Sequence, residues 1–272
     1  MRYLSLCSGI EAASVAWGGL GWTAVAFSEI EPFCCALLRE RFSHVPNLGD
    51  MTGIDGGDFY GAVDLVVGGT PCQGFSRAGL RRGMLDERSG LARDFVRIVS
   101  GARPRWIVWE NVPGALSTAG GRDFGAFVGA LDACGYSLAW RVLDAQYFGL
   151  PQQRRRLFLV GHHRDWRRAA QVLFEPESLF RTGEKGRKKG EVFPCLTGNG
   201  AKALDDTTPF VLEAAGARRA TPREWERLMG FPDDWTAIPG AADFSRYRAL
   251  GNSMAVPVMR WLGERIKSVE EV

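Results

Sequence analysis

The fold of this chain is decided by residues 64–73, DLVVGGTPCQ, in which a short apolar run is followed by two glycines, a proline and a cysteine. A second stretch, residues 106–112 (WIVWENV), places a carboxyl group, Glu110, directly after another apolar run. Short continuous apolar runs of this kind are typical of buried parallel strands. Ligands of an open α/β sheet bind beyond the carboxyl ends of its strands. We therefore expect Cys72 and Glu110 to serve one site.

Around these two stretches, the first 160 residues alternate short apolar runs with amphipathic segments, which is the pattern of βαβ units. Strands are predicted at residues 3–6, 23–27, 65–67, 107–109, 136–143 and 157–160, and helices at 11–17, 32–41, 91–100 and 123–133. The pattern predicts an α/β fold with a Rossmann-like sheet that carries helices on both faces.

The alternation of apolar runs and amphipathic segments ends after Gly161. Residues 164–217 carry turn formers and scattered charges without a sustained period, and we expect an irregular region there. Thr221, Pro222 and Glu224 form the capping signature of a helix start, and a last amphipathic helix is predicted at 255–267.

Composition describes an ordinary globular protein. The 272 residues are 46% hydrophobic and 24% charged, and the net charge of +3 permits a nucleic-acid partner without arguing for one. Six cysteines and three histidines form neither a Cys-x-x-Cys pair nor a zinc pattern, so reduced thiols and no metal site are expected. No segment is long enough to span a bilayer or to act as a signal peptide, which predicts a cytoplasmic protein with no membrane partner.

The pairing of Cys72 with Glu110 suggests chemistry on a ring. A cysteine can attack an electron-poor carbon, and a carboxyl group can share a proton with the ring that contains it. A free cysteine is more often a buried apolar side chain, but Cys72 lies in a turn beyond a strand. The apolar flanks of Glu110 would raise the pKa of a buried carboxyl group, which suits a proton donor.

Together and in this order, Pro71-Cys72-Gln73 and Glu110-Asn111-Val112 resemble the catalytic motifs of the DNA (cytosine-5)-methyltransferase family, in its bacterial or phage form. Further matches lie at Gln152, Arg154 and Arg156 (the Gln-x-Arg-x-Arg motif), at residues 221–232 and at residues 248–253. The resemblance covers about residues 1–160 and 218–267.

The resemblance implies transfer of a methyl group from S-adenosylmethionine to C5 of a cytosine in a specific duplex DNA sequence. Cys72 would add to C6 while Glu110 protonates N3. Of the Gln-x-Arg-x-Arg motif, Arg154 would contact the target cytosine and Arg156 would hold the active-site loop. A cytosine inside a duplex is inaccessible, so base flipping is required.

The resemblance also implies a set of cofactor-binding residues, with Glu29 at the ribose hydroxyls and Ile30 on the adenine. The full set is Leu6, Cys7, Ser8, Gly9, Glu29, Ile30, Asp50, Met51, Pro71, Leu91, Asn252 and Ser253. The first motif departs from the family, which usually has an acid at the position of Ser5, an aromatic residue at Cys7 and glycines at 11 and 12. The absence of a Gly-x-Gly-x-x-Gly run argues against a nicotinamide cofactor.

The implied organisation is a catalytic and cofactor-binding domain at 1–163, a small target-recognition domain at 164–235, and a C-terminal segment at 236–272 that returns to the catalytic domain. The expected partner is double-stranded DNA, and the expected state is a monomer. Two alternatives stay open: a tRNA cytosine-5 methyltransferase, and a non-catalytic DNA-binding module on the same fold.

Overall fold

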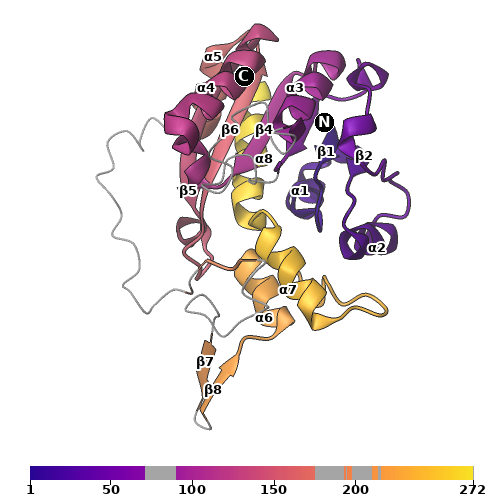
Figure 1. Ribbon diagram of the computed structural model, residues 1–272, viewed down its shortest axis with the longest axis vertical. Helices are drawn as coiled ribbons and strands as arrows, with labels where there is room; N and C mark the ends of the chain where they lie inside the picture. The colour runs from indigo at the N-terminus through magenta and orange to yellow at the C-terminus, as the bar shows by residue number, and fades with distance from the viewer. Residues whose placement is uncertain (71–89, 175–192, 194, 198–209, 214–215, 272) are drawn as a thin grey trace.

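A computed structural model of the chain describes residues 1–70, 90–174, 193, 195–197, 210–213 and 216–271. Six strands form one sheet in the order β2-β1-β3-β4-β6-β5 (Figure 1). They are β1 (Arg2–Leu6), β2 (Thr23–Ser28), β3 (Leu65–Gly68), β4 (Trp106–Asn111), β5 (Tyr136–Asp144) and β6 (Arg155–His163). The first four are parallel, and β6 runs antiparallel to β4 and β5. The strand order reverses at β1, and this kind of switch point is where open sheets bind ligands.

Eight α-helices accompany the sheet in the part of the chain that the structure describes. They are α1 (Ala12–Trp17), α2 (Pro32–Arg41), α3 (Gly90–Ala102), α4 (Arg122–Ala133), α5 (Trp166–Leu173), α6 (Pro222–Met229), α7 (Asp243–Asn252) and α8 (Val256–Glu270). A separate antiparallel pair, β7 (Phe210–Glu213) and β8 (Gly216–Arg219), projects at the end of the molecule where α6 and α7 lie (Figure 1).

The two faces of the sheet bury two separate hydrophobic clusters, because successive side chains of a strand point to opposite faces. Val67 and Val108 belong to the cluster that includes α1, α5 and α8. Val66 and Ile107, their neighbours in sequence, belong to the cluster that includes α3 and α4. Helices therefore cover both faces, and the predicted fold class is confirmed.

Most predicted elements are present, with ends that differ by a few residues. The helices α5 and α7 were not predicted, and the two turns of α5 are too short to establish a period in the sequence. Ala169, Val172 and Leu173 are the buried residues of α5, and it packs against β5, β6 and α8. The first strand was predicted to end at residue 6; β1 does end at Leu6, and Cys7 has a φ of 51° in the turn that follows.

No helix in the described ranges is long and apolar enough to cross a membrane.

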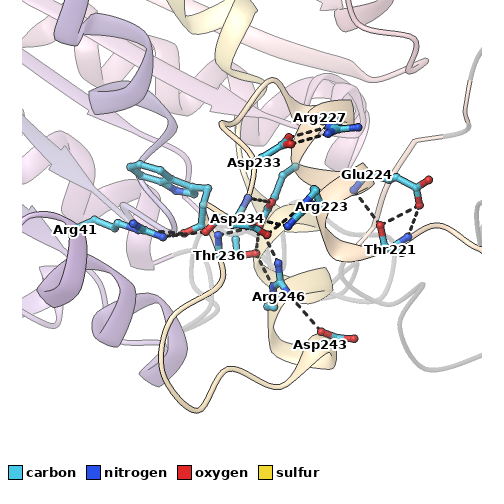
Figure 2. Close-up of polar contacts among 12 residues, drawn as sticks. Arg41, Thr221, Arg223, Glu224, Arg227, Asp233, Asp234, Thr236, Asp243 and Arg246 are labelled. Carbon is cyan, nitrogen blue, oxygen red and sulfur yellow. Dashed lines mark hydrogen bonds and ion pairs between the residues drawn. The ribbon is translucent and has the colours of Figure 1, made fainter.

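The segment after residue 220 is held by a dense set of polar contacts (Figure 2). The predicted capping box is present, since the Thr221 hydroxyl accepts from the backbone N–H of Glu224 and the Glu224 carboxylate accepts from that of Thr221. On the next turn of α6, the fully buried carboxylate of Glu226 accepts from the backbone N–H groups of Asp234 (2.7 Å) and Thr236 (2.8 Å). It also forms an ion pair with Arg246 of α7, at 3.2 Å.

We predict that Glu226→Ala destabilises the protein strongly, because it leaves the Arg246 guanidinium and two backbone N–H groups without their buried acceptor. Removing one partner of a buried ion pair costs about 3–5 kcal/mol, which corresponds to a fall in Tm on the order of 10 °C. Thermal unfolding followed by circular dichroism measures this. Glu264→Ala, at an exposed position of α8, is the matched control, and an equal Tm for both variants would contradict the prediction.

Candidate active site

The site is built where β3 and β4 leave the sheet side by side. Gly68 pairs with Trp109, so Gly69 and Glu110 come next to each other one residue later. A Cβ atom at Gly69 would lie 3.3 Å from Oε2 of Glu110 and 3.1 Å from the Met254 side chain. Because these distances are tighter than nearly all real Cβ contacts, the glycine allows the carboxyl group to approach the turn after β3 closely.

Thr70 is tied to the end of β4 by two hydrogen bonds. The indole Nε1 of Trp109 donates to the Thr70 hydroxyl and the Asn111 side-chain amide donates to the Thr70 carbonyl, both at 3.1 Å. Thr70 is buried as a result. Pro71 and Cys72, which follow directly, lie outside the described residues. The chain is therefore held beside Glu110 up to two positions before Cys72.

Glu110 is a buried carboxyl group beside a guanidinium. Nε of Arg156 lies 3.2 Å from Oε1 of Glu110 in an ion pair, although Oε1 has no hydrogen-bond partner of good geometry among the described residues. Burial raises the pKa of Glu110 above its ordinary value, and the charges of Arg156 and Arg154 act in the opposite direction. The upward shift agrees with the expectation from its apolar flanks.

A cavity of about 460 Å³ opens in front of these groups, at the carboxyl ends of the parallel strands. Glu110 and Arg156 line it, together with most of the residues predicted to bind the cofactor: Cys7, Gly9, Glu29, Ile30, Asp50, Met51, Leu91 and Asn252. Leu6, Ser8 and Ser253 line a smaller cavity of about 40 Å³, which shares several lining residues with the first. The larger volume lies within the range of small-molecule sites.

Glu29 connects the loops that follow β1 and β2. Its carboxylate accepts from the backbone N–H groups of Gly9 (2.7 Å), Ile30 (2.8 Å) and Glu31 (2.8 Å). A carboxylate has about four acceptor positions, so one more hydrogen bond can be made from the cavity side. The side chain of Ile30 is 68% exposed although it is apolar, which leaves a surface for a flat ring.

Cys7, which stands where the family usually has an aromatic residue, packs against Met51. Its sulfur lies 3.5 Å from the Met51 sulfur, and burial raises the pKa of Cys7 to about 12. Cys7 therefore stays a neutral thiol and lines the cavity as a small apolar side chain.

Gln152 and Arg154 are not among the cavity-lining residues. Arg154 is 2% exposed and donates to the carbonyls of Leu196 (2.8 Å), Gly251 (3.0 Å) and Ser253 (2.6 Å). The fully buried Gln152 donates to the Leu228 carbonyl at 2.7 Å and accepts from the Leu196 N–H at 3.2 Å. These side chains hold the C-terminal segment against β6, and a contact of Arg154 with the target base stays a prediction.

Sequence reasoning missed some residues that line the cavity. Ser28 ends β2, and Ser245 and Arg248 lie on α7. Nη1 of Arg248 is 4.0 Å from the carboxylate of Glu31, which lines the same cavity. Arg248 lies in a stretch that the motif analysis had singled out, but nothing local marks Ser245, because only the packing of α7 beside α2 brings it to the site.

Comparisons with known proteins agree with this geometry. The family described as C-5 cytosine-specific DNA methylase matches residues 1–197 and 181–268. A protein described as a DNA N-6-adenine-methyltransferase, from Escherichia phage P1, is 31% identical and matches 97% of this chain, which spans 61% of that relative's length. The type II methyltransferase M.SsoII of Shigella sonnei is 29% identical over 98% of this chain and 80% of its own.

The crystal structure of Dnmt2 methyltransferase from S. pombe has the same fold, with a TM-score of 0.78 at 21% identity, covering 98% of this chain and 99% of that one. The chain belongs to the C-5 cytosine-specific DNA methylase family, and is a DNA (cytosine-5)-methyltransferase. This confirms the family predicted from the two catalytic motifs.

We predict that Glu110→Gln becomes more stable relative to the wild type as the pH rises. The raised pKa means that folded Glu110 keeps its proton where the unfolded chain has lost it. The stability that this proton contributes is complete below the ordinary value of 4.5 and is lost as the pH rises through the folded pKa. Glutamine does not titrate, so the difference in unfolding free energy should grow across that range.

Urea unfolding of both proteins between pH 5 and 8 measures this difference, with Glu264→Gln on α8 as the control. If the variant instead loses relative stability with rising pH, the ion pair with Arg156 outweighs the cost of burial.

Proposed function

We propose that Cys72 and Glu110 act together on a flipped-out cytosine of duplex DNA, and that the adjoining cavity binds S-adenosylmethionine. The observation that carries this proposal is the junction of β3 and β4, where Thr70 is bonded to Trp109 and Asn111 beside a buried, protonatable Glu110. The family is S-adenosylmethionine-dependent.

The described residues suit this cofactor. An acid at the end of β2, Glu29, has capacity for a ribose hydroxyl, and the exposed Ile30 offers an apolar face for adenine. Glu110 lines the same cavity, and we place the reacting base beside it. When bound, S-adenosylmethionine supplies an electrophilic methyl group.

The chemistry follows from the residue types. The Cys72 thiolate forms a bond to C6 of cytosine while the Glu110 carboxyl group donates its proton to N3, which makes C5 a nucleophile. After C5 has taken the methyl group, the C5 proton passes to solvent water, and the electron pair left behind expels the thiolate from C6. The N3 proton then returns to Glu110. A carboxyl group whose pKa is raised by burial suits both the donation and the return.

We assign target recognition to the region around residues 164–235, between the catalytic sheet and the returning segment 236–272. Because α5 packs on β5 and β6, we propose that this region begins after Leu173 rather than at residue 164. We propose that the protein acts on duplex DNA as a monomer. The target cytosine must be flipped out of the duplex before Cys72 can reach its C6 atom.

Cytosine C5 is favoured over the exocyclic nitrogen of adenine, the position named for the phage P1 relative. An exocyclic amine carries its own lone pair, so its methylation needs no thiol that adds to the ring. A cysteine two positions after Thr70 in the sequence, together with a proton donor beside Thr70, therefore favours methylation of a ring carbon. Bisulfite sequencing of DNA from cells that express the protein reports cytosine methylation and its sequence context.

We predict that Glu29→Ala lowers the affinity for S-adenosylhomocysteine about 10- to 100-fold, because it removes a charge-assisted hydrogen bond to the ribose. Calorimetric titration measures this, with Glu40→Ala on the exposed face of α2 as the control. The 2′-deoxy analogue of the ligand separates a ribose contact from the loop contacts of Glu29. Equal losses for both ligands would show that Glu29 acts only on the loops.

We predict a covalent complex on DNA that contains 5-fluorocytosine, since fluorine cannot leave C5 as a cation and the final elimination stops. A duplex in which 5-fluorocytosine replaces every cytosine avoids any need to know the recognition sequence. With S-adenosylmethionine present, the wild type should give an adduct that survives denaturing electrophoresis. Cys72→Ser should not, because a hydroxyl is a far poorer nucleophile than a thiolate.

Cys134→Ser, at the end of α4 and away from the cavity, should form the adduct normally. An adduct in Cys72→Ser, or one that maps to another cysteine by mass spectrometry, would overturn the assignment.

A further inference from the structure

Glu11 is a buried carboxyl group that the proposed chemistry leaves without a role. It lies in the turn between β1 and α1, with a φ of 59°, and its side chain is 1% exposed. It lines the smaller cavity of about 40 Å³, together with Ser5 and Ser253. That cavity and the main one share Cys7, Gly9, Gly69, Glu110 and Asn252, so the two adjoin.

The partners of Glu11 are all neutral. The Ser5 hydroxyl donates to Oε1 at 2.5 Å, while the Ser14 backbone N–H (3.0 Å) and the Ser14 hydroxyl donate to Oε2. Within the described residues, no arginine, lysine or histidine forms an ion pair with it or lowers its pKa, and burial raises that pKa. A buried carboxylate with hydroxyl partners and no counter-charge is costly, and that cost is relieved by a proton or by a cation that arrives with a ligand.

The shape of the smaller cavity limits what that cation can be. Roughly 10–15 Å³ holds one water-sized group, so about 40 Å³ accepts a small head group but no ring. The residues assigned to the adenosyl end, Glu29 and Ile30, line only the main cavity, whereas Glu110 lines both. The end of the cofactor remote from its adenosine is an amino acid, which carries an ammonium group.

We propose that Glu11 binds the α-ammonium group of the methyl donor and serves as its counter-charge. Ser5 and Ser14 orient the carboxylate, and the hydroxyl of Tyr3, 2.6 Å from the Ser14 hydroxyl, extends that network into the core. The family usually has an acid at position 5 and a glycine at position 11. In this chain the acid comes from position 11 instead, and Ser5 is bonded to it. The proposal rests on the assignment of S-adenosylmethionine as the cofactor.

The alternative is a purely structural role, because Glu11 is also the N-cap of α1 through the Ser14 N–H. Glu11→Gln separates the two roles. Its amide oxygen can still accept from Ser14, so the cap is kept while the charge is lost. A ligand that lacks only the ammonium group then reports on the charge.

The experiment is calorimetric titration of the wild type and Glu11→Gln with two ligands. One is S-adenosylhomocysteine, and the other is 5′-S-(3-carboxypropyl)-5′-thioadenosine, which keeps the adenosine, thioether and carboxylate but has no amine. We expect the variant to lose about 10- to 100-fold in affinity for the first ligand and little for the second. The wild type should therefore bind S-adenosylhomocysteine more tightly than the analogue without the amine, and Glu11→Gln should bind the two with similar affinity. Glu40→Gln should keep the preference of the wild type.

An equal loss for both ligands, or no loss for either, would overturn the role of Glu11 as a counter-charge. The cofactor assignment would survive that result, because S-adenosylhomocysteine would still bind the wild type. Failure of the wild type to bind S-adenosylhomocysteine at all would overturn both the cofactor assignment and the role of Glu11.

Discussion

The pairing of β3 with β4 is the constraint on which the rest of the site depends. Its register brings Gly69 against Glu110, and the hydrogen bonds from Trp109 and Asn111 hold Thr70 at the end of the neighbouring strand. The same closeness removes Glu110 from water, which raises its pKa. Position and protonation of this carboxyl group therefore have one physical cause, the packing of two buried strand ends.

The C-terminal segment packs against the sheet and contributes residues to the cavity. Arg154, directly before β6, donates to the carbonyls of Gly251 and Ser253, so the end of α7 is held against the sheet. The buried Glu226 links α6 to α7 through Arg246. Residues more than 200 positions apart along the chain thus line one cavity. Holding these carbonyls requires a buried guanidinium, and burial lowers the pKa of Arg154 to about 10. A guanidinium with that pKa stays charged at neutral pH.

Much of the fold was predictable because buried parallel strands are continuous apolar runs with turn residues after them. Most of the residues predicted to bind the cofactor line the two cavities. Cys7, Gly9, Glu29 and Ile30 do so for the same reason, since they follow the ends of β1 and β2 at one edge of the sheet. The arginines of residues 152–156 were harder to interpret. A run of arginines looks the same whether a side chain faces DNA or, like Arg154, is buried among carbonyl groups.

The sequence by itself predicted most strands and helices of the sheet and the family, and it proposed the pair Cys72 and Glu110, because these depend on residue types and on spacing along the chain. Only the tertiary structure decided which charges are buried and what they face. In the sequence, Glu11 is only an acid at the start of a predicted helix, at a position where the family usually has a glycine. It becomes a candidate for ligand binding because folding removes it from water, gives it only neutral partners and leaves a small cavity beside it. Solvation and counter-charge are properties of three-dimensional neighbours, and no local pattern in a sequence encodes them.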